Sequence, residues 1–425
     1  MKKKLNYFLS FIFIFLILPF FIMKVSKGFM NSENKPDVKN MKINLPEKSE
    51  KELKGIWFSF IEWKKYNNGA NEKQWSKTVE EKIIPNLKSL HINNVFLHAT
   101  AHSDSFYFSK LYPMSNAVSK EYGATLDYDP FKIFVEKLKE NGFKVHAWLN
   151  PLRAMTDEEF SKIPDSYQTK KWYISKDRSD YYMKDRTNRY WLNPANKCVR
   201  NFISEAVEEI LNNFNQIDGI HIDDYFYPAG LDKNNVVEDD LKYYEKIKPN
   251  QNLQDFRRNS VTLLVKNFYD ISKKHGKIFG ISPQGNMENN FNDMFLDLKE
   301  IISKGYLNYV MPQIYYGFEN ETHDFNKSVK EWNDFILNNK EKGDKIDFYV
   351  GLAAYKCGMK EDIHAGKGKE EWNKNSDILK RQLQALNLVP NCLGYVFFSY
   401  YNFFSPSEEQ KNIIEKEKQN LLQVI

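Results

Sequence analysis

The sequence is poor in cysteine and lacks the short motifs of several large enzyme classes. Its three cysteines, Cys198, Cys357 and Cys392, are too few and too scattered for a disulfide framework or a zinc finger. No His-x-His pair, His-Glu-x-x-His segment or Gly-x-Ser-x-Gly turn occurs, which argues against the common zinc and serine hydrolases. No glycine-rich phosphate loop follows an early strand, so a doubly wound nucleotide-binding sheet is disfavoured.

The excess of positive charge is confined to the N-terminal part of the chain. The formal net charge is +5, from 61 basic and 56 acidic residues. Residues 1–54 hold eleven of the basic and five of the acidic residues, so the remaining chain is nearly neutral. Because a polyanion needs a basic surface, the globular part gives no support for a nucleic-acid partner, and we expect none.

An uncharged apolar run follows the first residues. Lys2 to Lys4 precede nineteen residues without a charge, Leu5 to Met23, and Lys24 and Lys27 close the run. A positive start before such a run is typical of a secretion signal or a membrane anchor. We predict that segment 1–28 is one or the other. The body would then lie outside the cytoplasm, either secreted or held at the outer face of the cytoplasmic membrane through the uncleaved run.

The polar segment 29–52 is typical of a flexible linker. After it, short β-rich runs alternate with helical patterns. Eight such units over 53–425 predict one (β/α)8 TIM barrel. Segments 156–190 and 225–252 follow the third and fourth strands, which predicts insertions on the C-terminal rim. The expected strands are 55–58, 94–98, 144–150, 219–223, 278–282, 309–313, 348–353 and 394–399. The expected helices are 129–141, 199–214, 255–275, 325–339, 378–388 and 408–422.

Polar and aromatic side chains gather where the expected strands end, as they do in barrel active sites. The segment from Asp218 to Pro228 is the clearest example. Alternation along the strand predicts that Ile220 and Ile222 face the helices, while His221, Asp223 and Tyr225 face the barrel interior and mouth. The other candidates at strand ends are Trp148, Asn150, Arg153, Asp224, Gln313, Tyr315, Tyr316 and Tyr355.

This combination of rings, amides and carboxylates suits a polysaccharide, because sugar faces stack on rings and hydroxyls need polar partners. Glycoside hydrolysis needs one ionised and one protonated carboxyl group. We expect Asp223 to be the ionised group, with His221 and Arg153 holding its charge and lowering its pKa. Asp224 is the first candidate acid, followed by Glu288, Glu319 and Asp104. Adjacent residues can lie too close for this chemistry, so orientation of a sugar hydroxyl is an alternative role for Asp224.

The chain resembles the glycosyl hydrolase-like 10 family of exported bacterial proteins over about Gly55 to Tyr400. The motifs that carry the resemblance are Gly55–Trp57, Phe106–Lys110, Tyr112–Ser115, Asp127–Pro130, Lys144–Arg153, Leu192–Pro194, Asp218–Pro228, Phe256–Asn259, Gly280–Pro283, Met311–Tyr315 and Gly351–Tyr355.

The resemblance implies a TIM-barrel glycoside hydrolase that acts on peptidoglycan glycan strands outside the cytoplasm. It implies that Asp223 and Asp224 are the paired acids, and it adds Asp104 and Asn193 to the expected substrate-binding residues. Two regions depart from the family pattern. Thr100 to Ser103 replace a basic residue after the second strand, and Asn286 to Glu288 stand where the family tends to have Trp.

Two other functions remain open on the residues alone. One is a glycan-binding barrel without catalysis. The other is a metal-dependent hydrolase or deacetylase using His98, His102, His221 and Asp223. His98 and His102 are four residues apart on a strand-to-loop segment, where that spacing lacks the one-face geometry that it would have on a helix. The favoured prediction is a glycoside hydrolase that needs neither metal nor cofactor.

Overall fold

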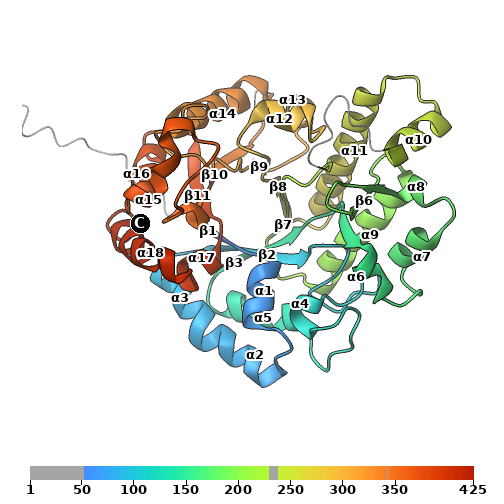
Figure 1. Ribbon diagram of the computed structural model, residues 1–425, viewed down its shortest axis with the longest axis horizontal. Helices are drawn as coiled ribbons and strands as arrows, with labels where there is room; N and C mark the ends of the chain where they lie inside the picture. The colour runs from blue at the N-terminus through green and yellow to red at the C-terminus, as the bar shows by residue number, and fades with distance from the viewer. Residues whose placement is uncertain (1–51, 229–237, 342) are drawn as a thin grey trace, which may run out of the picture. The chain divides into compact units, whose positions relative to one another are not determined.

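Eight parallel strands close into a barrel, in the spatial order β1-β11-β10-β9-β8-β7-β3-β2. Figure 1 shows this ring of strands surrounded by helices. Each strand overlaps one that the sequence predicts, so the (β/α)8 prediction is confirmed. The barrel strands are β1 (Leu53–Phe58), β2 (Asn94–Thr100), β3 (Lys144–Leu149), β7 (Gly219–Ile222), β8 (Ile278–Ile281), β9 (Tyr309–Val310), β10 (Asp347–Leu352) and β11 (Cys392–Phe397).

This computed structural model describes residues 52–228, 238–341 and 343–425. The predicted signal or anchor over 1–28 and nearly all of the predicted linker over 29–52 lie outside the described residues. The barrel falls within one compact unit, Ser49–Ile425. Within the described ranges, no helix combines the length and the apolar character needed to cross a membrane.

The helices between the strands are amphipathic, and their apolar faces pack on the barrel. In α5 (Pro130–Glu140), Asp129 caps the first turn and Phe131, Phe134 and Leu138 are buried. The other principal helices are α1 (Phe60–Tyr66), α2 (Glu72–Thr78), α3 (Ile84–Ser89), α9 (Lys197–Asn213), α11 (Leu253–Lys274), α13 (Leu298–Ser303), α14 (Phe325–Asn339), α16 (Ile378–Leu386) and α18 (Glu408–Leu421). The shorter helices are α4 (Asn116–Ser119), α12 (Met287–Asn292), α15 (Glu371–Lys374) and α17 (Tyr400–Phe404).

The first rim insertion contains a three-stranded antiparallel sheet that the sequence analysis did not predict. Its strand order is β4-β6-β5, with β4 at Arg153–Thr156, β5 at Tyr182–Lys184 and β6 at Arg189–Leu192. Figure 1 shows the helices of both insertions to one side of the barrel. These helices are α6 (Asp157–Ser161), α7 (Gln168–Ile174), α8 (Arg178–Tyr181) and α10 (Glu238–Ile247). The sheet fixes the position of Arg153, because that residue pairs with Trp191 of β6.

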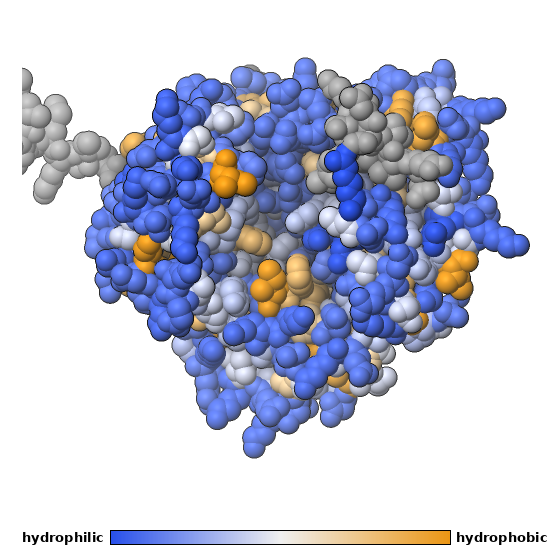
Figure 2. All heavy atoms as spheres, viewed as in Figure 1, coloured by the Kyte–Doolittle hydropathy of each residue, from blue (hydrophilic) through white to orange (hydrophobic). Residues whose placement is uncertain are grey.

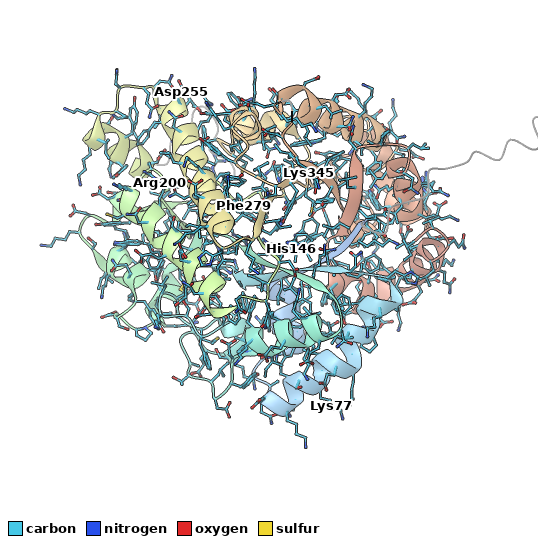
Figure 3. All side chains as sticks on the ribbon, turned by 180° about the vertical axis from the view of Figure 1, so that it is seen from behind. Lys77, His146, Arg200, Asp255, Phe279 and Lys345 are labelled. Atoms are coloured by element: carbon cyan, nitrogen blue, oxygen red, sulfur yellow. The ribbon has the colours of Figure 1, made fainter. Side chains whose placement is uncertain are left out.

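The barrel interior is packed with aromatic rings that form a core separate from the outer one. Trp57, Phe96, Trp148 and Tyr309 belong to this interior cluster. His146 of β3, labelled in Figure 3, lies among the strands and stacks on Phe96 at 4.5 Å between ring centroids. The lower barrel is therefore filled by side chains, as in other TIM barrels.

The expected alternation along β7 is confirmed. Ile220 and Ile222 are fully buried in the outer core between strands and helices. His221 points inward, where its Nδ1 lies 3.0 Å from the Tyr309 hydroxyl. The next residue of the same parity, Asp223, therefore emerges at the barrel mouth.

Gly280 of β8 makes room for the interior ring of Tyr309, and its replacement gives a first prediction. A Cβ atom at this position would lie 2.3 Å from the Tyr309 ring. We expect Gly280→Ala to lower the free energy of unfolding by about 1–3 kcal/mol, the usual cost of overpacking a core. Urea unfolding measures the loss. A double-mutant cycle with Tyr309→Leu tests the cause. The double variant should lose less unfolding free energy than the sum of the losses in the two single variants. Strict additivity would contradict this explanation.

A buried carboxylate joins the first strand to the last. Glu62 of α1 accepts hydrogen bonds from the Ser59 amide at 2.9 Å and the Tyr401 amide at 2.7 Å. The hydroxyls of Ser59 and Ser399 also donate to it. Burial raises the pKa of Glu62, while these donors oppose the rise. Glu62 thus holds the loop after β1 against the loop after β11, where the barrel closes.

Candidate active site

A cavity of about 180 Å³ opens at the C-terminal ends of the barrel strands. Figure 2 shows this face hollowed near its centre. We call the cavity the deep compartment. It is lined by Trp57, Ser59, Phe60, Ile61, His98, Trp148, Asn150, Arg153, Asp223, Asp224, Tyr225, Ser282, Gln313, Tyr315, Tyr355 and Phe398. Each of the eight barrel strands, or the loop after it, contributes at least one of these residues, which is the usual construction of a TIM-barrel active site.

Two neighbouring carboxyl groups, Asp223 and Asp224, follow directly after β7. Asp223 accepts hydrogen bonds from the Trp148 indole nitrogen at 3.2 Å and from the Tyr225 amide at 3.3 Å. Asp224 accepts one from the Gln313 amide nitrogen at 3.0 Å. The same Gln313 nitrogen donates to the Ser282 carbonyl at 2.9 Å, which fixes its direction. Each carboxyl group is therefore held by a donor from another strand, Trp148 of β3 for Asp223 and Gln313 after β9 for Asp224.

The environment of the pair favours retention of a proton. Burial raises the pKa of Asp223 well above its ordinary value, and the neighbouring charge of Asp224 adds to the rise. Burial also raises the pKa of Asp224, although the Gln313 amide opposes it. The positive charge of Arg153 lowers the pKa of both groups without offsetting burial. The pair therefore keeps a proton to higher pH than an exposed aspartate would.

A pH-dependent stability follows from this raised pKa. The folded state binds the Asp223 proton more tightly than the unfolded state, so folding loses stability as pH rises above the ordinary aspartate pKa of 3.8. Asp223→Asn removes that titration. We therefore expect the difference in unfolding free energy, variant minus wild type, to be more positive at neutral pH than at acidic pH. Urea unfolding at about pH 4 and pH 7 checks this, and a change in the opposite direction would contradict it.

Aromatic side chains form much of the wall around the carboxyl groups. Trp148 stacks on His98, with ring centroids 3.5 Å apart. Tyr315 and Tyr355 meet edge to face at 5.6 Å. The Arg153 guanidinium lies 4.2 Å from the centre of the Tyr225 ring, which orients both side chains at the rim. These rings provide flat apolar surfaces beside hydrogen-bonding groups.

His221 lies beneath the deep compartment and does not hold the charge of Asp223, contrary to the expectation from sequence. Its imidazole accepts a hydrogen bond from the Trp57 indole at 3.3 Å and lies 3.0 Å from the Ser282 hydroxyl. Burial lowers the pKa of His221 well below its ordinary value, so the ring is neutral. Among the described contacts, none joins His221 to Asp223. The histidine instead positions Trp57 and Ser282, which line the compartment.

A second cavity, of about 540 Å³, adjoins the deep compartment. Asp224, Gln313, Tyr315 and Tyr355 line both, so the two form one cleft with Asp224 at their junction. We call this cavity the outer compartment. Its other lining residues are Gln284, Gly285, Asn286, Asn289, Tyr316, Asn320, Thr322, His323, Lys356, Asp362 and His364. Asp223, by contrast, lines only the deep compartment.

The outer compartment has its own ring platform and its own ion pair. Tyr316 stacks on His323 at 4.9 Å between ring centroids. The Lys356 ammonium lies 2.5 Å from the Asp362 carboxylate, and both side chains are buried. With its amides and hydroxyls, this compartment can bind a second polar unit next to the first.

The structure brings most of the predicted site residues together. Asp223 and Asp224 line the cleft, as do the substrate-binding candidates Trp148, Asn150, Arg153, Tyr225, Gln313, Tyr315, Tyr316 and Tyr355.

Besides His221, two other predicted substrate-binding residues do not line the cleft. Asp104 is buried and accepts hydrogen bonds from the amides of Ala101 and His102, so it shapes the loop after β2. Asn193 is fully buried and caps the turn before α9 through the Ala195 amide. Neither lines the cleft, nor do Glu288 and Glu319, the other acid candidates.

Sequence reasoning missed one wall of each compartment. In the deep compartment, Trp57, Phe60 and Phe398 look like ordinary core residues at the ends of the first and last strands. In the outer compartment, the missed residues His323, Lys356 and His364 come from loops without periodicity, where the sequence contains no motif. The strand-end rule that identified Tyr315 applies equally to Phe398, and it could have found that residue.

The alternative metal site receives no geometric support from the described residues. Across them, no group of three or more His, Cys, Asp or Glu side chains is arranged to hold a metal ion. His98 accepts a hydrogen bond from the Phe60 amide on its Nδ1, which occupies one of its two possible ligand atoms.

Comparison with known proteins agrees with this architecture. The glycosyl hydrolase DigH of Escherichia coli (strain K12) is 25% identical over 396 residues, covering 86% of each chain. The glycosyl hydrolase YngK of Bacillus subtilis (strain 168) is 27% identical over 341 residues, covering 74% of this chain and 63% of the relative.

A solved structure shares the fold. The PgaB (BpsB) glycoside hydrolase domain from Bordetella bronchiseptica superposes with a TM-score of 0.52 at 14% identity, covering 86% of this chain and 98% of the domain. Residues 52–367, which include the carboxyl pair and both compartments except the wall at Phe398, match the glycosyl hydrolase-like 10 family. The protein is therefore a member of the glycosyl hydrolase-like 10 family.

Proposed function

We propose that the protein is a glycoside hydrolase that cleaves a bacterial cell-wall or other extracellular glycan, with the glycan strands of peptidoglycan as the favoured substrate. The observation that carries the proposal is the pair of neighbouring carboxyl groups, the buried Asp223 and the half-buried Asp224, in an aromatic cleft of two joined compartments. Acid–base cleavage of a glycosidic bond needs a protonated carboxyl group at the bond, and the environment of this pair favours retention of a proton.

The two carboxyl groups have different positions and therefore different roles. Asp224 lines both compartments, so it faces a bond between a sugar in one and a sugar in the other. This position suits the general acid that protonates the leaving oxygen. Asp223 lines only the deep compartment. In the proposed mechanism the one proton that the coupled pair retains is on Asp224, and the charge of Asp223 stabilises the positive character that develops at the reacting sugar.

The shape and chemistry of the cleft support a chain of sugars as the substrate. At about 180 Å³ the deep compartment is smaller than the roughly 300–1,000 Å³ of pockets for drug-sized ligands, so it suits a single sugar unit. The outer compartment, with its Tyr316 and His323 platform, suits the next unit. Stacking rings beside amides and hydroxyls match the apolar faces and hydroxyl edges of sugars.

Incubation of the full chain, in mild detergent, with peptidoglycan stripped of its peptides tests this function. We expect mass spectrometry to detect shorter glycan fragments, and we expect a chelator to leave the rate unchanged. Binding of fragments without new products would identify a glycan-binding protein instead. Release of acetate without chain cleavage, abolished by a chelator, would identify a metal-dependent deacetylase.

The proposed place of action is outside the cytoplasm, with segment Leu5 to Met23 as a signal or anchor. Protease added to intact protoplasts should digest the barrel if it is anchored at the outer face. Mass analysis of the mature N-terminus then separates the two forms, since cleavage removes the apolar segment and anchoring retains it. A barrel protected from protease in intact protoplasts and absent from the medium would contradict the proposal.

A further inference from the structure

We propose that the deep compartment binds an N-acetylated amino sugar, and that the acetamido oxygen of this sugar, not a protein carboxylate, attacks the anomeric carbon. This inference rests on the proposed function and specifies its substrate and mechanism. It starts from the arrangement of the two acids. Asp223 and Asp224 are consecutive residues at the end of one strand, β7.

The direct mechanisms of glycoside hydrolysis need two carboxyl groups that flank the scissile bond. Their separation is about 5–5.5 Å for a protein nucleophile and about 6.5–9.5 Å for an activated water. Consecutive Cα atoms are about 3.8 Å apart, so Asp223 and Asp224 approach a bound sugar from the same strand end rather than from opposite faces. Among the described residues of the deep compartment, these two are the carboxylates present.

The outer compartment does not provide the missing group. Its additional carboxylate, Asp362, is buried and bound to Lys356 at 2.5 Å. It also lies in the compartment that would hold the leaving sugar. Since the described residues that line the deep compartment include no third carboxylate, we place the nucleophile opposite Asp224 on the bound sugar, and an acetamido group beside the anomeric carbon is such a nucleophile.

The surroundings of Asp223 suit this group. The carboxyl group of Asp223 is held in place by the Trp148 indole and the Tyr225 amide, so it can accept a hydrogen bond from an acetamido N–H at a fixed position. Rings of Trp57, Trp148 and Phe398 line the same compartment and offer an apolar surface for the acetamido methyl. Asp223 is then the residue that orients the nucleophile and stabilises the charge that it acquires.

The reaction balances in two steps. First, the acetamido oxygen bonds to the anomeric carbon as the glycosidic bond breaks, and Asp224 transfers its proton to the departing oxygen. The product is an oxazolinium ring, whose N–H faces the Asp223 carboxylate. Second, Asp224 takes a proton from water, and the water oxygen attacks the anomeric carbon. The ring bond then breaks and returns its electron pair to the acetamido oxygen, which leaves a sugar of retained configuration.

The test uses aryl chitobiosides in which the acetamido group beside the scissile bond carries no, one, two or three fluorine atoms. Fluorine withdraws electrons from the carbonyl oxygen, so we expect kcat to fall stepwise, by about 100-fold or more across the series. The thiazoline analogue of N-acetylglucosamine imitates the ring intermediate, and we expect it to compete with the substrate. Asp223→Asn should weaken thiazoline binding, while Asp224→Asn should preserve it.

The outcomes separate this inference from the proposed function. Cleavage of peptidoglycan strands with a rate independent of fluorine, or with inverted product, leaves the glycosidase function intact and overturns the acetamido mechanism. Failure to cleave both the strands and the aryl chitobiosides overturns the two proposals together. Circular dichroism and urea unfolding of each variant ensure that a loss of binding or rate is not a loss of folding.

Discussion

Replacement of Asp224 with asparagine is expected to slow glycan cleavage by about 10²–10⁴-fold, the usual contribution of a general acid. The expectation follows from the position of Asp224 at the junction of the two compartments, next to the bond between two bound sugars. Asparagine can still accept the hydrogen bond from Gln313, so the local structure should persist. The measurement is kcat on stripped peptidoglycan strands, with urea unfolding to verify the fold.

Substrates with different leaving groups distinguish the two acids. A dinitrophenyl leaving group departs without protonation, so Asp224→Asn should cleave a dinitrophenyl chitobioside nearly as fast as the wild type. Asp223→Asn should slow both this substrate and the glycan by about 10²-fold or more, since it removes charge stabilisation that every leaving group needs. Glu319→Gln is the matched control, because Glu319 does not line the cleft. Equal losses on both substrates for Asp224→Asn would contradict its role as the acid.

The barrel and the polar rim of its cavity could be predicted from the sequence, because the patterns that indicate them repeat along each strand. Alternation along β7 placed His221 and Asp223 inward and Ile220 and Ile222 outward. The polar residues at strand ends, such as Gln313 and Asp224, converge because parallel strands end at one rim. Neither inference requires knowledge of a contact between distant residues.

Other features depend on contacts that no local pattern encodes. The sheet of β4, β5 and β6 is built from strands of three or four residues, too short for a periodic signal. Asp104 resembles a catalytic acid in sequence. In the structure it accepts hydrogen bonds from the amides of Ala101 and His102, which hold its side chain within its own loop. Likewise, His221 was expected to pair with Asp223, and the contacts of its ring with Trp57 and Ser282 emerge only when β1, β7 and β8 are assembled.

Glu62→Ala is expected to lower the free energy of unfolding by about 2–5 kcal/mol, because each buried donor that loses its acceptor costs about 1–3 kcal/mol. The variant leaves two backbone amides, of Ser59 and Tyr401, without their acceptor. Glu62→Gln should cost less, because one side-chain oxygen remains. Urea unfolding measures these losses, with Glu415→Ala as a control: Glu415 is about half exposed and pairs with Lys418, so its removal should cost under about 1 kcal/mol.

The same variant tests whether barrel closure shapes the site. Ser59 and Phe60 follow β1 and Phe398 follows β11, and all three line the deep compartment. Glu62 ties these two segments together through Ser59 and Ser399, although it does not line the cleft itself. We therefore expect Glu62→Ala to raise KM for glycan more than it lowers kcat, because it loosens a binding wall and leaves Asp224 in place. A loss of stability below about 1 kcal/mol, with unchanged KM, would show that the barrel closes without this carboxylate.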